Sequence, residues 1–213
     1  MKKTSTDFDR IADVYDAWYA TAAGRRYDAA QRELLSRLLP NAGAGRRQLL
    51  DAGCGSGHWS IYFAEQGFHV TGIDISPKMI AVAKARQLSN CHFRVGDVQC
   101  LPYKTGRFNV VCAITVMEFV ADVQKACEEI LRCLKPGGCM LIGALNRLAK
   151  INRRRVDADT WPFASANMFT LDELRLFLGQ FGDVTIGISM EDNHRGADSL
   201  ESGALIAARV VKR

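Results

Sequence analysis

The chain has 213 residues, of which 48% are hydrophobic and 24% charged, and its formal net charge is +5. This length fits one domain with a full hydrophobic core, so neither disulfides nor a structural metal is needed for stability. The mild positive charge is compatible with an acidic substrate, an anionic membrane surface or RNA, but it requires none of them.

The cysteines and histidines show no spacing typical of a metal or redox site. The seven cysteines stand at positions 54, 91, 100, 112, 127, 133 and 139, without a C-x-x-C pair, and most lie in apolar stretches. Their odd number argues against a secreted disulfide framework, so a reducing cytoplasm is the expected location. No metal, no signal peptide and no membrane span is expected, because ligand spacing and long apolar runs are both missing.

The first 40 residues predict two helices. The first apolar stripe at helical spacing consists of Phe8, Ile11, Ala12, Tyr15 and Tyr19. The second consists of Tyr27, Ala30, Leu34, Leu35 and Leu38, and Pro40 ends it. Residues 41–45 are expected to form a loop.

From residue 47 onward, strand-like and helix-like segments alternate. Strands are expected at 48–52, 68–74, 91–95, 108–116 and 139–145, and helices at 58–66, 77–88 and 123–134. Ser76 and Asp122 are expected to cap the second and third of these helices. This alternation is typical of a parallel sheet with helices on both faces.

The last third of the chain closes the sheet. Residues 146–168 are polar, basic at 153–155, and predicted to be the least regular part of the chain. Thr170 and Glu173 form a capping box for a helix that runs to about Gln180. Strands at 184–190 and 203–211, joined by the polar stretch 192–202, are expected to pair antiparallel. The predicted fold class is therefore α/β: a doubly wound, mostly parallel seven-stranded sheet with an antiparallel last strand and N-terminal helices.

The most informative segment is Asp51-Ala-Gly53-Cys-Gly55-Ser-Gly57, where a buried strand passes into a helix. Glycines there allow positive φ and close approach of the backbone to a ligand. The dinucleotide fingerprint G-x-G-x-x-G does not fit, because His58 or Ser60 stands where its last glycine would be. Ligands of open α/β sheets bind at the carboxyl ends of strands, where the strand order switches. This turn is therefore a predicted binding site.

Two further strand ends carry a carboxylate. Asp74 ends the second strand, and Gly96-Asp97 follows the third. A carboxylate at the position of Asp74 can accept hydrogen bonds from both hydroxyls of a ribose. The sequence thus indicates a nucleoside ligand at this edge of the sheet.

Together, the D-x-G-x-G-x-G turn, Asp74, Asp97 and the run Leu134-Lys-Pro-Gly-Gly138 resemble class I S-adenosylmethionine-dependent methyltransferases, and in particular the small single-domain "methyltransferase type 11" kind. The matching elements cover residues 47–145. Met117-Glu-Phe-Val120 followed by Asp122 also resembles this family, although Phe119 stands where many relatives carry His. The resemblance implies a Rossmann-like fold, S-adenosylmethionine as cofactor and S-adenosylhomocysteine as product.

The resemblance also implies roles for individual residues. The glycine-rich backbone would lie against the methionine part of the cofactor, Asp74 would hold the ribose, and Asp97 would bind the adenine amino group. The predicted cofactor-binding residues are Tyr19, Asp51, Gly53, Cys54, Gly55, Gly57, Asp74, Ile75, Met79, Asp97, Val98, Ile114 and Thr115. No catalytic residue is predicted, because a sulfonium methyl is already activated and positioning supplies much of the rate.

The predicted acceptor pocket consists of Tyr15, Glu118, Asn146, Trp161 and Phe163. The predicted function is methyl transfer to a small-molecule acceptor by in-line displacement, with no nucleic-acid partner and no integral membrane association. Within one domain, residues 1–45 would form a helical cap, 46–145 the cofactor-binding core, 146–169 a substrate lid and 170–213 the closing helix and strands. Two alternatives stay open: transfer to phospholipid, protein or RNA, and a non-catalytic cofactor-binding domain that regulates a partner.

Overall fold

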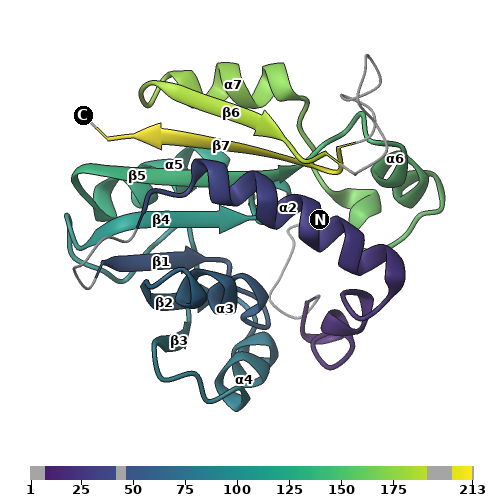
Figure 1. The fold of residues 1–213 in the computed structure, drawn as a ribbon, viewed down its shortest axis with the longest axis horizontal. Helices are drawn as coiled ribbons and strands as arrows, with labels where there is room; N and C mark the ends of the chain where they lie inside the picture. Colours follow the sequence, from purple (N-terminus) through teal and green to yellow (C-terminus); the bar gives the residue numbers. More distant parts are fainter. Residues whose placement is uncertain (1–7, 42–46, 191–202, 213) are drawn as a thin grey trace.

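A computed structural model of the chain describes residues 8–41, 47–190 and 203–212. Seven strands form one sheet in the order β3-β2-β1-β4-β5-β7-β6 (Figure 1). The strands are β1 (Gln48–Ala52), β2 (His69–Asp74), β3 (Cys91–Val95), β4 (Phe108–Ile114), β5 (Leu134–Leu145), β6 (Val184–Ile188) and β7 (Leu205–Val211). Strands β1 to β5 pair in parallel, and β7 pairs antiparallel with both β5 and β6. The predicted fold class is confirmed.

Helices cover both faces of this sheet. The helical elements are η1 (Tyr15–Trp18), α2 (Ala22–Leu38), α3 (His58–Glu65), α4 (Pro77–Ala85), η2 (Met117–Phe119), α5 (Val123–Cys133), α6 (Lys150–Asp157), η3 (Phe163–Ser165) and α7 (Leu171–Gly179). Helices α2 and α3 lie in front of the sheet in Figure 1, and α5 lies behind it. Apolar side chains of α2 and α3 form one core cluster, and those of α5 and α7 form the other. Strand β4 lies between the two clusters and is buried along almost its whole length.

The predicted helix starts follow from capping side chains. Ser76 accepts a hydrogen bond from the Met79 amide (3.1 Å), and Asp122 accepts one from Lys125 (3.0 Å). Thr170 and Glu173 form the reciprocal capping box. These contacts satisfy amide groups that an isolated helix start would leave without partners, and they fix where each helix begins relative to its strand.

The predicted N-terminal helix through Phe8 and Tyr19 is wrong. Only Phe8 and Asp9 at its start are helical, turns follow, and η1 is a short 3₁₀ helix. Two aspartates explain the difference. Asp9 accepts a hydrogen bond from Ser76, and Asp16 accepts one from Ser56 (2.7 Å) and pairs with Arg86. These tertiary contacts outweigh the local apolar periodicity.

Residues 146–168, predicted to be the least regular part of the chain, contain two short helical elements that the sequence pattern does not indicate, α6 and η3. Helix α6 has little apolar periodicity and is held by a buried amide instead. The Asn152 side chain donates to the carbonyl oxygens of Asn146 and Ala204, both at 2.9 Å. A helix fixed in this way leaves no hydrophobic pattern for sequence analysis to detect.

Several element boundaries differ from prediction for backbone reasons. Strand β4 stops at Ile114 because Thr115 has a φ of 55°, and α4 stops at Ala85, close before Gln87 with a φ of 52°. Strand β5 already begins at Leu134, with a register shift opposite β4. The predicted connection at 192–202 and most of the loop at 41–45 lie outside the described residues. The division of the chain into cap, core and lid stays a prediction.

All seven cysteines belong to the described part of the chain, and none forms a disulfide. Six are buried, as expected of small apolar side chains, and Cys100 is exposed. Among the described residues, no helix combines the length and apolar character that crossing a membrane requires.

Candidate functional site

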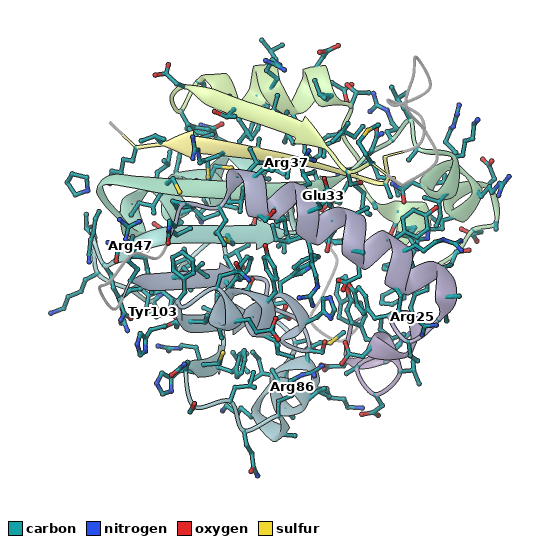
Figure 2. The ribbon with its side chains drawn as sticks, in the orientation of Figure 1. Arg25, Glu33, Arg37, Arg47, Arg86 and Tyr103 are labelled. Atoms are coloured by element: carbon teal, nitrogen blue, oxygen red, sulfur yellow. The ribbon has the colours of Figure 1, made fainter. Side chains whose placement is uncertain are left out.

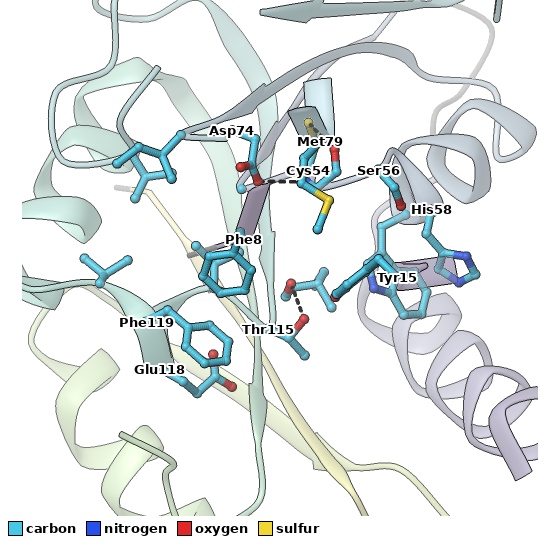
Figure 3. A pocket seen from close by; sticks show the side chains of 18 of the residues that line it. Phe8, Tyr15, Cys54, Ser56, His58, Asp74, Met79, Thr115, Glu118 and Phe119 are labelled. Carbon is cyan, nitrogen blue, oxygen red and sulfur yellow. Dashed lines mark hydrogen bonds between the residues drawn. The ribbon is translucent and has the colours of Figure 1, made fainter. Parts of the chain in front are cut away.

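A cavity of about 590 Å³ lies at the carboxyl ends of β1, β2 and β4 (Figure 3). The chain runs from β1 outward through β2 and β3, then returns to place β4 on the other side of β1. This switch in strand order is where α/β sheets bind ligands. Ligand pockets usually measure roughly 300–1,000 Å³, so the cavity can hold a molecule of cofactor size.

The glycine-rich turn forms one wall of the cavity. Gly53 has a φ of 80°, and a Cβ atom there would lie 2.4 Å from a methyl group of Val116. Gly55 has a φ of 51°, and its amide donates to Asp74 Oδ2 at 2.8 Å. Because these two glycines have no side chain, their backbone is exposed to the cavity, and Val116, two residues after β4, can pack closely against Gly53.

Asp74 is held in place by backbone amides on both sides. Its Oδ2 accepts from Gly55, and its Oδ1 accepts from the Ser76 amide at 2.9 Å. Burial raises the pKa of Asp74, and these hydrogen bonds oppose the increase. Each carboxylate oxygen can accept a second hydrogen bond, so this side chain can receive two hydroxyl groups from a ligand.

Asp97 has a similar fixed position at the end of β3. Its Oδ1 accepts from the Gln99 amide at 2.8 Å, and the Gln99 side chain donates to both carboxylate oxygens at 3.2 and 3.1 Å. Gln99 Oε1 in turn accepts from the Asp122 amide at 2.9 Å. The start of α5 is thus connected to the carboxylate that lines the cavity.

Thr115 at the end of β4 holds a strained backbone conformation. A β-branched residue rarely adopts its φ of 55°. Its amide donates to Gly143 and its hydroxyl to Ile114, both at 2.7 Å. Such strain, about 1–3 kcal/mol, persists where surrounding contacts fix it, and it concentrates at functional sites.

The N-terminal residues bring aromatic rings to the cavity. Tyr19 stacks on His58, with ring centres 3.8 Å apart and an interplanar angle of 9°. His58 Nε2 lies 2.7 Å from Asp28 Oδ1, and this interaction helps to lower the pKa of Asp28 against its burial. Burial, with the negative charges of Asp74 and Asp16, raises the pKa of Tyr15 to about 12. Tyr15 therefore stays protonated at neutral pH.

The opposite side of the cavity is apolar with a buried acid beneath it. Phe8 contacts both Phe119 and Trp161, with ring centres 5.3 and 5.4 Å apart. Glu118 is fully buried and accepts a hydrogen bond from the Leu145 amide. Figure 3 shows Phe8 and Phe119 side by side, with Glu118 next to them.

The structure brings most of the predicted cofactor-binding residues together. The lining includes Tyr19, Gly53, Cys54, Gly55, Asp74, Ile75, Met79, Asp97, Val98, Ile114 and Thr115. Asp51 and Gly57 do not line the cavity. Asp51 is only 1% exposed and accepts a hydrogen bond from Ser60 at 2.6 Å, whereas Gly57 precedes α3 as its N-cap.

Of the residues predicted to bind the acceptor, Tyr15 and Glu118 line the cavity, and the other three do not. Asn146 is buried and hydrogen-bonded to the carbonyl of Gly203 (2.8 Å). Trp161 is 42% exposed behind Phe8, and Phe163 packs against Arg155, whose guanidinium lies 4.3 Å from the ring centre.

Several lining residues were not among the predicted site residues. They include Phe8, Ser56, His58, Trp59, Gln99, Val116, Phe119, Val120, Ala121, Ser165 and Asn167. Trp59 gave only an apolar helix pattern, whereas Phe8 begins the N-terminal segment, through Tyr15 and Tyr19, that resembles the segment closing over the cofactor in this family. For Ser56 and His58, their position in or beside the glycine-rich turn could have indicated that they line the cavity. Ser165 and Asn167 fall in the predicted lid segment 146–169, but no pattern in that segment singles out these two residues.

This sheet order, with the antiparallel β7 and a ligand cavity after β1, is the fold of the class I methyltransferases. An S-adenosylmethionine-dependent methyltransferase from Thermotoga maritima has the same fold, with a TM-score of 0.78 and 21% identity, covering 98% of this chain and 99% of that one.

Sequence comparison identifies the family. Residues 50–142 match the family model described as "Methyltransferase domain". A malonyl-[acyl-carrier protein] O-methyltransferase from Serratia marcescens is 36% identical over 131 residues, covering 60% of this chain and 51% of the relative. A ubiquinone biosynthesis O-methyltransferase from Coxiella burnetii is 33% identical over 104 residues, covering 47% of this chain and 44% of the relative. Residues 50–142 therefore form a methyltransferase domain of the class I S-adenosylmethionine-dependent kind. The chain spans about half the length of these two relatives.

Proposed function

We propose that this protein binds S-adenosylmethionine in the 590 Å³ cavity and transfers the methyl group to a small-molecule acceptor. The observation that carries the proposal is Asp74, whose carboxylate is held by two backbone amides with acceptor capacity facing the cavity. A nucleoside ribose presents two neighbouring hydroxyls that match such an acceptor.

The other lining residues fit the remaining parts of this cofactor. Ile75 and Met79 offer apolar surface for a flat ring beside Asp74. Asp97 and the Val98 amide are an acceptor and a donor for the edge of adenine. The bare backbone at Gly53 and Gly55 leaves room for the methionine chain, which would place the sulfur near Thr115.

When bound, the cofactor supplies a methyl group on a positively charged sulfur, which leaves as a neutral thioether while the acceptor atom forms a bond to that methyl carbon. The protein's part is to hold the acceptor in line behind the methyl group, an arrangement worth up to roughly 7–11 kcal/mol. The rigid strand end at Thr115 and the rings of Phe8 and Phe119 border this space and exclude water.

The ionisable side chains near the acceptor favour positioning over proton removal. Because the pKa of Tyr15 is about 12, its hydroxyl acts as a hydrogen-bond donor at neutral pH. Glu118 is engaged by the Leu145 amide, which orients its carboxylate at the cavity wall. We infer that these two groups orient a polar part of the acceptor.

The acceptor is a small and partly apolar molecule. Phe8, Phe119 and Val120 supply apolar lining, whereas Ser165 and Asn167 supply polar groups from the 146–169 segment. Malonyl-[acyl-carrier protein] and ubiquinone precursors enter the screen as candidates because relatives carry those names.

The test has two stages. Calorimetry first measures binding of S-adenosylhomocysteine to the wild type. Metabolite, carrier-protein, lipid, protein and RNA fractions are then incubated with the protein and methyl-labelled cofactor. We expect binding, and label in the small-molecule fraction that Phe119→Ala reduces while cofactor affinity stays the same. Absence of cofactor binding refutes the whole proposal. Label only in the lipid, protein or RNA fraction, and none on a small molecule or on the acyl group of a carrier protein, refutes the acceptor class.

A further inference from the structure

A second, smaller cavity of about 200 Å³ lies at the other end of the sheet, where β1 and β4 begin. Its lining consists of Pro40, Arg47, Asn109, Lys135, Pro136, Gly137, Gly138, Cys139, Arg209 and Val211. None of these residues lines the larger cavity. Figure 2 labels Arg47 at this end of the molecule, far from the carboxyl ends of the strands.

Among the described residues, no helix covers this part of the sheet. Helix α2 covers the face that carries Cys139, but it ends at Leu38, and Pro40 follows. Arg209 and Val211 are two positions apart on β7, so their side chains point to the same face of the sheet. Cys139 on β5 is the direct pairing partner of Val211, and its side chain therefore lies on this face too. Residues 135–138, near the start of β5, border the other side of the cavity, and a Cβ at Gly138 would lie 2.8 Å from the Asn109 carbonyl oxygen.

The lining is strongly basic. Its described residues include Arg47, Lys135 and Arg209 and no carboxylate side chain. Within the part of the chain that the structure describes, none of the three forms a salt bridge. Arg47 donates to the Asn41 carbonyl at 2.8 Å and Lys135 to Asn109 Oδ1 at 3.2 Å, which leaves other donors of both groups available. Like charges gathered around one small cavity favour an anion there.

Arg209 gives the second, independent indication. Its Nε is buried and has no acceptor among the described residues. Buried donors in proteins nearly always have a partner, so each exception calls for an explanation. Arg209 and Arg47 line the cavity together with Cys139. Burial raises the pKa of the Cys139 thiol to about 11, and the positive charges of these two residues oppose the increase.

We propose that this cavity binds a small oxyanion, specifically a phosphate group, with Arg209 as the central ligand and Lys135 and Arg47 at the rim. Three cations suit a group with more than one negative charge better than a single carboxylate, and the planar guanidinium fork matches phosphate oxygens. At about 200 Å³ the space is smaller than a usual drug-sized pocket, so only the phosphate group itself would enter. The site is separate from the proposed methyl-transfer site.

Calorimetric titration of the full chain with inorganic phosphate, at constant ionic strength, tests this proposal. A parallel titration with phosphoserine distinguishes a free ion from the phosphate group of a larger ligand by which of the two binds more tightly. We expect saturable binding to the wild type and at least tenfold weaker binding to Arg209→Gln and Lys135→Gln. Arg26→Gln, which removes one exposed charge from the first turns of α2, should bind like the wild type.

Lys135 is half-buried near the start of β5, and its ammonium group donates to Asn109 Oδ1. Glutamine keeps a donor at this position, so Lys135→Gln keeps the test valid if Arg209→Gln folds poorly, which circular dichroism would reveal. No saturable binding of either probe to the wild type overturns the proposal. Equal affinity of the wild type and Lys135→Gln, or an equal loss in Arg26→Gln, overturns it as well, because binding would then reflect net charge alone.

Discussion

Replacing Asp74 by asparagine keeps the size of the side chain but removes its charge and one acceptor oxygen. In the structure each carboxylate oxygen accepts a hydrogen bond from a backbone amide, one from Gly55 at 2.8 Å and the other from Ser76 at 2.9 Å. The charge-assisted hydrogen bonds proposed for the cofactor ribose are worth about 1–3 kcal/mol. Affinity for S-adenosylhomocysteine should therefore fall about 5- to 150-fold at 25 °C.

The same substitution should change the stability of the ligand-free protein much less. Burial raises the pKa of Asp74, which means that the folded protein already disfavours the charged form. A neutral side chain removes this penalty and offsets the loss of one amide contact. Calorimetry of the wild type, Asp74→Asn and Asp74→Ala measures affinity, and thermal unfolding measures stability. Asp172→Asn, on the exposed surface of α7, is the matched control. Unchanged affinity in both Asp74 variants would refute the reasoning.

The remaining predictions concern the backbone, a buried acid and an aromatic clamp. Gly53→Ala should lower the free energy of unfolding in urea by more than about 2 kcal/mol, because positive φ and the Val116 contact at 2.4 Å both oppose a side chain. Gly55→Ala, with open space around it, should lose only about 1–2 kcal/mol, and equal losses would contradict the argument. Burial raises the pKa of Asp51 to about 7, so its folded form holds a proton that the unfolded chain releases near pH 4. Wild-type stability should thus fall between about pH 4 and pH 7, by at most about 4 kcal/mol. Asp51→Asn should flatten this dependence in urea unfolding at pH 5 and 7.5, and parallel curves would show that another group is responsible. Arg155→Met should cost about 0.5–2 kcal/mol in thermal unfolding, because the guanidinium lies over two aromatic rings; an equal loss in the exposed control Arg154→Met would argue against this.

The sequence predicts the sheet and much of the cavity wall because these depend on local patterns. The helix starts are marked by N-cap side chains that accept a hydrogen bond from an amide three residues later. These are Ser76, Asp122 and Thr170. Glycines at positive φ and carboxylates at strand ends mark the turns that the parallel sheet brings together at one edge. Each of these signals can be interpreted without knowledge of distant contacts.

The parts that were missed depend on contacts between distant segments. The contacts of Phe8 with Phe119 and Trp161 are not indicated by the apolar periodicity of the first 20 residues. The His58–Asp28 pair joins residues 30 positions apart. Asp51 matches the family motif, yet its carboxylate turns to Ser60, because a side chain at a strand end can face either the cavity or the adjacent helix.

The distribution of thiols has a practical consequence. Cys100 is exposed, whereas the other six cysteines are buried. A maleimide dye should therefore attach at a single position without any substitution. That position directly follows Asp97-Val-Gln99, which lines the cavity where the adenine is proposed to bind. The unmodified protein thus offers a site for a fluorescent reporter of ligand occupancy.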